Sequence, residues 1–140
     1  MSFQWPVRVY WEDTDAGGIV FYANYLKYME RARTEWLRAM GIEQRTLRDE
    51  AGGQFVVSEV KIKYHRPARL DDELAVSVDL GHVGQASLII GQRVLSKSEH
   101  DTLLCEGTIR IGWVDAATLR PSRMPSQVSG TLERYQRSTA

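Results

Sequence analysis

The chain contains VRVYWEDTDAGGIVFYANYLKYMERARTEWLRAMGI at residues 7–42, where a strand pattern, an acidic turn and a long helical pattern follow one another. Apolar residues alternate with mostly polar ones over residues 7–12, which predicts a half-buried strand. The turn occupies residues 12–18, where the adjacent Gly17 and Gly18 let the backbone bend tightly and approach another group closely. This pattern predicts a strand that turns sharply into a helix.

The helical pattern begins near Tyr22 and carries an apolar stripe that would face the core of a folded domain. The stripe consists of Tyr25, Met29, Ala32, Trp36 and Met40, and Leu26 and Leu37 widen it. Asn24 can cap the N-terminus of the helix, and Gly41 is well placed to end it in a left-handed conformation. We therefore expect one long amphipathic helix between these two residues.

The acidic turn places Asp15 just before this helix. Main-chain N–H groups at a helix N-terminus have no acceptor within the helix and attract negative charge. We therefore expect the Asp15 carboxylate and these donors to share one small space. A purely structural explanation competes with a chemical one, because aspartate is common in tight turns and near helix starts. For Asp13 we expect the structural role, with its carboxylate bonded to the turn backbone.

A strand-like alternation replaces the helical period after a break at residues 51–53. Short turns separate the alternating segments, which favours antiparallel pairing, since parallel strands need long crossover connections. Shorter elements complete the prediction: a lead-in at residues 1–5, a short helix at 43–50 and another near 128–135. In the first strand after the break, one face would hold Val56, Ser58, Val60, Ile62 and Tyr64. One long helix with an antiparallel meander predicts an α+β fold.

Length and composition predict a single domain, residues 1–140, with one hydrophobic core. Basic and acidic residues number 18 each, and the absence of net charge argues against a nucleic-acid or anionic-membrane partner. No apolar run is long enough to span a bilayer, and the first residues lack the basic start and apolar segment of a signal peptide. We therefore expect a cytoplasmic protein.

The other reactive side chains give weaker signals. His65, His82 and His100 fit no zinc spacing, so we expect no metal site. Cys105 is the only cysteine, and we explain it as a core residue rather than a nucleophile. The sequence contains neither a Gly-x-Ser-x-Gly elbow nor a phosphate-binding loop. A group of basic residues can either meet ligand phosphates or form a solvated face: Lys63, Arg66, Arg69, Arg120 and Arg123.

The sequence DTDAGGIVFYANYLKYMERARTEWL, residues 13–37, resembles the signature of the 4-hydroxybenzoyl-CoA thioesterase family. The resemblance is closest to the branch of small bacterial acyl-CoA thioesterases associated with the Tol–Pal system. Its matching positions are Asp13 to Asp15, Gly18, Tyr25, Glu30, Arg33 and Glu35. Further matches at residues 64–74 and 114–125 extend the resemblance over nearly the whole chain.

This resemblance implies the hotdog fold, in which a curved antiparallel sheet of about five strands wraps around a long central helix. It also implies a homodimer or homotetramer that builds each site from two subunits. The implied activity is hydrolysis of short-chain aliphatic or aryl acyl-CoA thioesters, with acyl carrier protein as a second possible carrier of the acyl group. No cofactor is implied, because the CoA thioester is itself the substrate.

The resemblance also implies roles for individual residues. The catalytic carboxylate is the second aspartate of the motif, Asp15, acting as nucleophile or as general base for water. The main-chain N–H of Tyr22 is the implied oxyanion donor, and Gly18 and Tyr25 are the implied substrate contacts. Many members of the Tol–Pal branch have histidine at the position of Tyr22, whereas aryl-CoA thioesterases have an aromatic residue there. A main-chain donor survives this exchange.

Two other functions compete with hydrolysis. A hotdog hydratase or dehydratase acting on a hydroxyacyl thioester usually needs a histidine beside an acid on the helix segment, and no histidine lies between Val7 and Gly41. A non-catalytic module would bind acyl thioesters without releasing a thiol. The fold alone cannot separate these functions.

Overall fold

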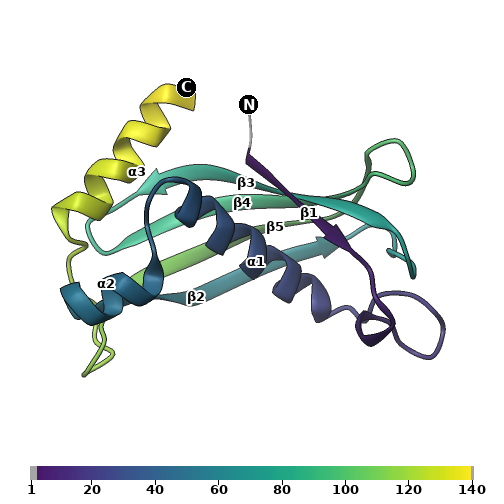
Figure 1. The fold of residues 1–140 in the computed structure, drawn as a ribbon, viewed down its shortest axis with the longest axis horizontal. Coiled ribbons are helices and arrows are strands. Elements are labelled where there is room, and N and C mark those ends of the chain that lie inside the picture. The colour runs from purple at the N-terminus through teal and green to yellow at the C-terminus, as the bar shows by residue number, and fades with distance from the viewer. Residues whose placement is uncertain (1–2, 140) are drawn as a thin grey trace.

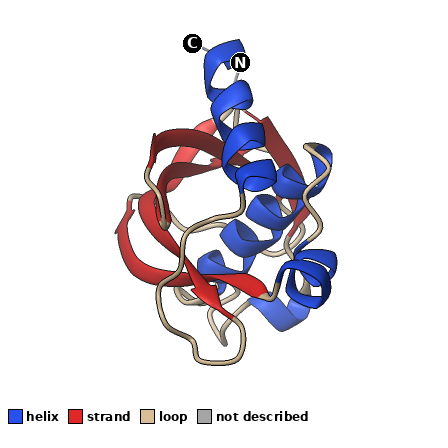
Figure 2. Cartoon of the chain, turned by 90° about the vertical axis from the view of Figure 1, so that its left-hand side faces the viewer, coloured by secondary structure: helices blue, strands red, loops and turns tan. Residues whose placement is uncertain are grey.

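A curved antiparallel sheet wraps around helix α1 (Asn24–Ala39) in the computed structural model, which describes residues 3–139 (Figures 1 and 2). Its five strands have the order β1-β3-β4-β5-β2, so β1 and β2 are the two edges. The strands are β1 (Phe3–Arg8), β2 (Gly53–Tyr64), β3 (Glu73–Val83), β4 (Ser87–Ser96) and β5 (Thr102–Asp115). Two further helices, α2 (Gln44–Ala51) and α3 (Ser126–Thr139), lie near one end of the sheet (Figure 1). The predicted α+β fold with one long helix and five antiparallel strands is confirmed.

Helix α1 buries most of the predicted stripe against the concave face of the sheet (Figure 2), but Met40 follows the helix as its C-cap and is only partly buried. The buried residues are Tyr25, Tyr28, Met29, Ala32, Trp36 and Leu37. Tyr28 was not part of the predicted stripe, and Leu26, predicted to widen it, is 41% exposed at its margin. None of the helices within residues 3–139 is both long and apolar enough to cross a membrane.

The two ends of α1 show one correct and one wrong prediction. Gly41 adopts the left-handed conformation with φ +83°, and the Ile42 N–H returns to the Leu37 carbonyl at 2.9 Å, so the predicted helix end is confirmed. Asn24 is the first helical residue rather than the cap, which is Ala23. The Asn24 side chain instead donates to the main-chain oxygen of the preceding acidic loop.

The first strand lies earlier in the chain than predicted. β1 begins at Phe3 and pairs with β3, so the predicted lead-in at residues 1–5 is wrong from Phe3 onward, and Met1 and Ser2 lie outside the described residues. The strand also ends sooner, at Arg8. Pairing with a neighbouring strand that the local pattern cannot reveal determines this register.

A short 3₁₀ turn at Trp11–Asp13 replaces the predicted end of the strand, and Trp11 is 76% exposed. Asp13 explains the change: its Oδ2 accepts the Tyr10 N–H at 2.9 Å, while its own N–H donates to the Tyr10 carbonyl at 3.0 Å. These two bonds close a turn where a strand would otherwise continue.

Strand β2 contains a bulge that changes which side chains face α1. Its register with β5 shifts between Val57 and Glu59, so Ser58 is the extra residue. The inner face therefore holds Phe55 and Val57 before the bulge, and Val60, Ile62 and Tyr64 after it. The prediction that Val56 and Ser58 share this face is wrong, because one added residue inverts the alternation.

A buried polar contact fixes the position of α1 on the sheet. Gln92 of β4 is 1% exposed, and its amide donates to the Met29 carbonyl at 3.1 Å. Its Oε1 accepts the Arg33 Nη1 at 3.0 Å. Buried polar groups that are fully bonded in this way favour one arrangement of helix over sheet.

Candidate active site

The acidic loop folds back on itself as an antiparallel tongue before α1. Thr14 and Val20 form an isolated bridge, flanked by bonds from the Asp15 N–H to the Ile19 carbonyl at 2.9 Å and from the Phe21 N–H to the Asp13 carbonyl at 3.0 Å. The tongue is therefore a short paired structure rather than a free loop.

The tip of the tongue is a tight turn closed by the Gly18 N–H, which donates to the Asp15 carbonyl at 3.0 Å. Gly18 has φ +79°, a left-handed conformation that residues with a Cβ rarely adopt. This conformation explains why position 18 holds a glycine. The Gly18 carbonyl also accepts the Leu70 N–H at 3.4 Å, a long contact that leads to the β2–β3 connection. The predicted substrate contact at Gly18 stays a prediction.

Asp15 exposes its carboxylate at this tip, and Oδ1 accepts the Gly17 N–H at 2.8 Å. Such a bond fixes the carboxylate over its own turn. Within residues 3–139 the carboxylate makes no hydrogen bond to the first turn of α1. In the tongue Asp15 lies opposite Ile19, and Ile19 precedes Tyr22 by three residues. The expected close approach of carboxylate and helix donors is therefore not a direct contact within this chain.

Asp13 has the structural role that we predicted. It is buried, its carboxylate accepts the Tyr10 N–H at 2.9 Å, and its main-chain oxygen accepts the Asn24 side chain at 2.8 Å. The same oxygen accepts the Phe21 N–H, so Asp13 links the 3₁₀ turn, the tongue and the start of α1. Burial beside this carboxylate also raises the pKa of Tyr28.

Tyr22 lies in the turn between the tongue and α1, and its side chain is exposed. No acceptor for its main-chain N–H occurs in the part of the chain that the structure describes. Its carbonyl accepts the Tyr64 hydroxyl at 2.9 Å. The main-chain N–H implied as a donor at Tyr22 is thus unpaired within residues 3–139, and its role stays a prediction.

Tyr25 supports the loop from inside the core. It is 2% exposed, its ring meets the Tyr28 ring edge-on at 6.0 Å, and burial raises the pKa of its hydroxyl. That hydroxyl accepts the Ala68 N–H at 2.9 Å, and the Ala68 carbonyl accepts the Val20 N–H at 2.9 Å. These bonds join the tongue to the β2–β3 connection. The predicted substrate contact of Tyr25 stays a prediction, and its observed role is packing.

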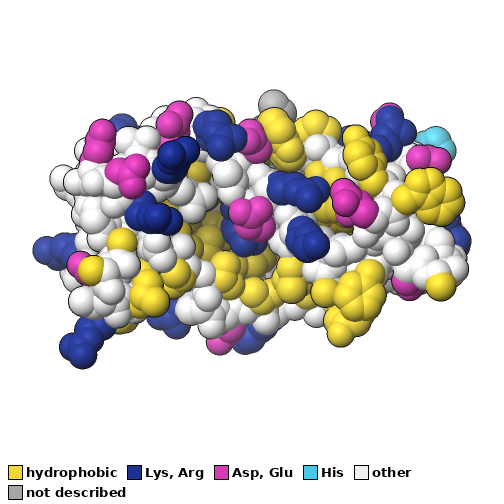
Figure 3. Space-filling view, turned by 60° about the horizontal axis from the view of Figure 1, so that its bottom comes forward, with side chains coloured by type: hydrophobic (Ala, Val, Ile, Leu, Met, Phe, Trp, Pro, Cys, Tyr) yellow, Lys and Arg dark blue, Asp and Glu magenta, His cyan; other side chains and the backbone are white. Residues whose placement is uncertain are grey.

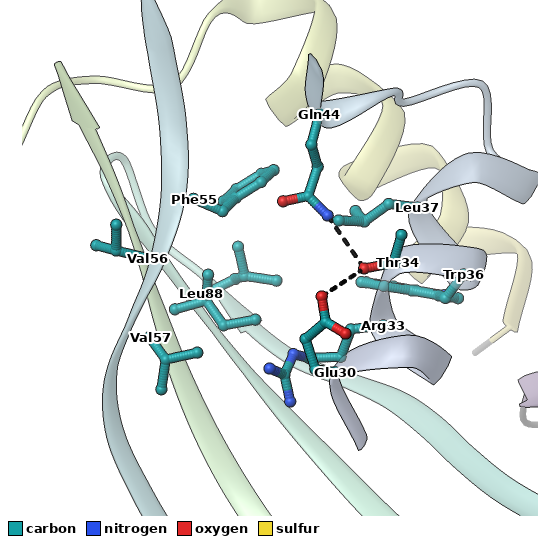
Figure 4. A pocket seen from close by; sticks show the side chains of 11 residues that line it. Glu30, Arg33, Thr34, Trp36, Leu37, Gln44, Phe55, Val56, Val57 and Leu88 are labelled. Atoms are coloured by element: carbon teal, nitrogen blue, oxygen red, sulfur yellow. Dashed lines mark hydrogen bonds between the residues drawn. The ribbon is translucent and has the colours of Figure 1, made fainter. Parts of the chain in front are cut away.

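A cavity of about 150 Å³ lies between α1 and strands β2, β4 and β5 (Figure 4). Thr34 accepts from the Gln44 amide and donates to Glu30, both at 3.4 Å. Burial lowers the pKa of Arg33 at its edge, although Glu30 opposes that shift. The other lining residues are mainly apolar: Trp36, Leu37, Phe55, Val56, Val57, Leu88 and Ile111. Figure 3 shows the hollow, with hydrophobic side chains in and beside it and charged ones at its mouth.

Sequence reasoning did not predict this cavity. Glu30 and Arg33 were part of the family signature, which was the only available signal, but the apolar wall comes from strands distant in sequence. The bulge in β2 turns Val57 toward the cavity, and no local pattern indicates a bulge.

The other candidate side chains contribute no reactive centre. Cys105 is fully buried, and burial raises the pKa of its thiol to about 12, so the predicted core role is confirmed. The His65 Nε2 lies 2.9 Å from the Glu106 Oε2 and forms a hydrogen bond with it. Among residues 3–139 no three His, Cys, Asp or Glu side chains gather in a way that could hold a metal ion. The basic residues Lys63, Arg66, Arg69, Arg120 and Arg123 are exposed, and a phosphate contact stays a prediction.

The chain is similar to known proteins over almost its whole length. Residues 9–132 match the sequence profile of the Thioesterase-like superfamily. The acyl-CoA thioesterase YbgC of Haemophilus influenzae is 40% identical over 131 residues, which is 94% of each protein. A probable thioesterase from Bartonella henselae superposes with TM-score 0.82 and 28% identity over 89% of this chain and 100% of that one. The BH1999 gentisyl-coenzyme A thioesterase superposes with TM-score 0.81 and 25% identity over 92% and 98%.

Proposed function

The chain belongs to the thioesterase-like superfamily and is a thioester hydrolase, and we propose that it cleaves acyl-CoA thioesters at the tongue that carries Asp15. One observation carries the assignment of the site: a single folded-back loop presents an exposed carboxylate at Asp15 and, at Tyr22, a main-chain N–H without an acceptor in residues 3–139. Acyl transfer to water needs both kinds of group.

The chemistry requires no further group from the protein. Asp15 either attacks the thioester carbonyl carbon or takes a proton from the attacking water. In both routes the C–S bond breaks and the CoA thiolate leaves and takes up a proton. Water that Asp15 has deprotonated gives the carboxylate product directly, whereas direct attack by Asp15 leaves an Asp15–acyl anhydride that water then hydrolyses to the carboxylate and free Asp15. The Tyr22 N–H stabilises the oxyanion, and the loss of such a donor typically costs about 3–4 kcal/mol of transition-state stabilisation.

The substrates that we propose are short-chain aliphatic or aryl acyl-CoA thioesters, with acyl carrier protein as an alternative carrier. The cavity beside α1 supports the proposal of small acyl groups, because it is mainly apolar and has a volume of only about 150 Å³. The aromatic residue at position 22, which resembles the aryl-CoA thioesterases, supports the proposal of aryl substrates. We place the activity in the cytoplasm, where acyl-CoA is made and used.

The exposed edge strand β2 supports the proposal that a second copy of this chain is a partner. Its inner face leaves Val57 47% and Val60 39% exposed, and beyond β5 the strand has no neighbour among the described residues. An uncovered edge strand of 12 residues with an apolar inner face invites pairing. In a two-fold antiparallel pair of β2 strands, the Tyr64 end of one strand lies beside the Phe55 end of the other. Tyr64 in turn contacts Tyr22 of its own chain. The tongue of one copy would then lie near the cavity of its partner.

Val60→Asp tests this pairing. We expect the wild-type protein to have a mass of at least twice the 16.0 kDa of one chain and the variant to shift toward the monomer, because a carboxylate in an apolar interface is costly to desolvate. Light scattering measures the mass. Thr108→Asp, on the opposite face of β5, is the control and should leave the assembly unchanged. A monomeric wild-type protein, or an unchanged Val60→Asp assembly, would refute the pairing.

A panel of acyl-CoA thioesters of increasing length, with benzoyl-CoA, tests the proposed function by release of free thiol. We expect turnover that is highest for the short or aryl members. Tight binding without thiol release from any member would favour the binding module. Reversible hydration of an enoyl-CoA, followed in the ultraviolet, would favour the hydratase.

A further inference from the structure

The tongue and the first turn of α1 are tied to the sheet by a tyrosine at the end of β2. Tyr64 is the last residue of that strand, and its hydroxyl donates to the Tyr22 carbonyl at 2.9 Å across 42 positions in sequence. The bond acts on the residue whose N–H has no acceptor within residues 3–139 and is the proposed oxyanion donor. It therefore joins the proposed site directly to the sheet.

The ring of Tyr64 is itself held in place. It packs edge-on against the Tyr25 ring at 5.6 Å and the Tyr22 ring at 6.3 Å. Tyr25 is fixed in turn by the bond from the Ala68 N–H to its hydroxyl. A chain of contacts thus runs from the core through Tyr64, which is itself 45% exposed, to the turn at Tyr22.

Tyr22 is otherwise held mainly through its neighbours in sequence. The Phe21 N–H donates to the Asp13 carbonyl at 3.0 Å, and the Asn24 N–H donates to the Phe21 carbonyl at 2.8 Å. The second bond holds the planar Phe21–Tyr22 peptide group, to which the Tyr22 N–H belongs. The Tyr64 hydroxyl holds the next peptide group through the Tyr22 carbonyl, so the two bonds together fix the backbone on both sides of the Tyr22 Cα.

We propose that Tyr64 is a positioning residue that aligns the Tyr22 N–H for oxyanion stabilisation, an inference that rests on the proposed hydrolase function. Donors to an oxyanion act only when they are preorganised, and a misplacement of about 1 Å can lower the rate about 100-fold. Because burial raises the pKa of Tyr64, its hydroxyl keeps its proton and remains a donor throughout the neutral range.

Tyr64→Phe removes this hydroxyl and keeps the ring. We expect kcat and kcat/KM for the best thioester to fall together by about 10-fold, with KM changed less than about twofold, because the lost alignment matters only in the transition state. We expect the Tm to fall by less than ~3 °C, since the partner carbonyl can bind water. A variant that was merely less stable would not separate kcat from KM in this way.

Two measurements keep the test decisive. Tyr135→Phe removes a tyrosine hydroxyl on α3 and should retain the wild-type kcat. Nitrogen-15 relaxation should show the Tyr22 amide to be rigid in the wild-type protein and mobile in Tyr64→Phe, and this readout does not depend on turnover. If the wild-type protein released no thiol, the proposed function would fail, while relaxation would still test the tether. Wild-type kcat with a rigid Tyr22 amide in Tyr64→Phe would overturn the inference.

Discussion

Asp15→Asn should lower kcat for the best acyl-CoA substrate by at least ~10³-fold, which corresponds to about 4 kcal/mol of transition-state stabilisation. An amide is neither a nucleophile toward a thioester nor a base for water, so either proposed role is lost. The fold should survive, because the asparagine oxygen can still accept the Gly17 N–H that now bonds to Oδ1 at 2.8 Å. Thiol release at saturating substrate measures the effect.

The matched control is Asp49→Asn on α2, which also replaces an exposed carboxylate by an amide and should retain wild-type turnover. Equal melting temperatures would confirm that both variants are folded. If Asp15→Asn kept kcat within about tenfold of the wild type, the tongue would not be the reaction centre. A single turnover in oxygen-18 water tests for direct attack, because label in the Asp15 carboxylate requires an Asp15–acyl anhydride that water hydrolyses at the Asp15 carbonyl.

The regular parts of this fold were predictable from the sequence because local patterns determine them. The stripe from Tyr25 to Leu37 has helical spacing, Gly41 suits the left-handed helix end, and short turns explain the antiparallel pairing of β3, β4 and β5. The place of β2 departs from the predicted meander, because β2 pairs with β5 and not with its sequence neighbour β3. The errors occur where a distant partner or a single side chain overrides the pattern. Ser58 adds a residue to β2, and Asp13 closes a turn where alternation predicts more strand.

The candidate site divides in the same way. The structural role of Asp13 was predictable, because an aspartate in a turn commonly bonds the nearby backbone. The bond between Tyr64 and Tyr22 was not, since its partners lie 42 residues apart. The cavity was not predictable either, because its walls come from α1, the start of α2 and three strands that only the folded chain brings together.

Trp36→Ala should reduce the free energy of unfolding by about 3–5 kcal/mol, the usual cost of removing a large buried aromatic side chain. Trp36 is 1% exposed on α1, and its ring meets the Tyr135 ring of α3 edge-on at 5.5 Å. It also forms part of the cavity wall, so its removal would enlarge an existing void instead of leaving a site that can collapse. Urea unfolding at fixed protein concentration measures the change.

Trp36→Phe should be far less costly, and the comparison tests the cause. The Trp36 Nε1 is buried without an acceptor among the residues that the structure describes, and such an unsatisfied donor is unfavourable. Phenylalanine loses part of the ring but removes this donor, so the two effects oppose each other and a cost of about 1 kcal/mol is expected. If Trp36→Phe were as destabilising as Trp36→Ala, an unrecognised acceptor must bind the indole N–H. If Trp36→Ala cost less than ~1.5 kcal/mol, the contact between α1 and α3 would not be part of the rigid core.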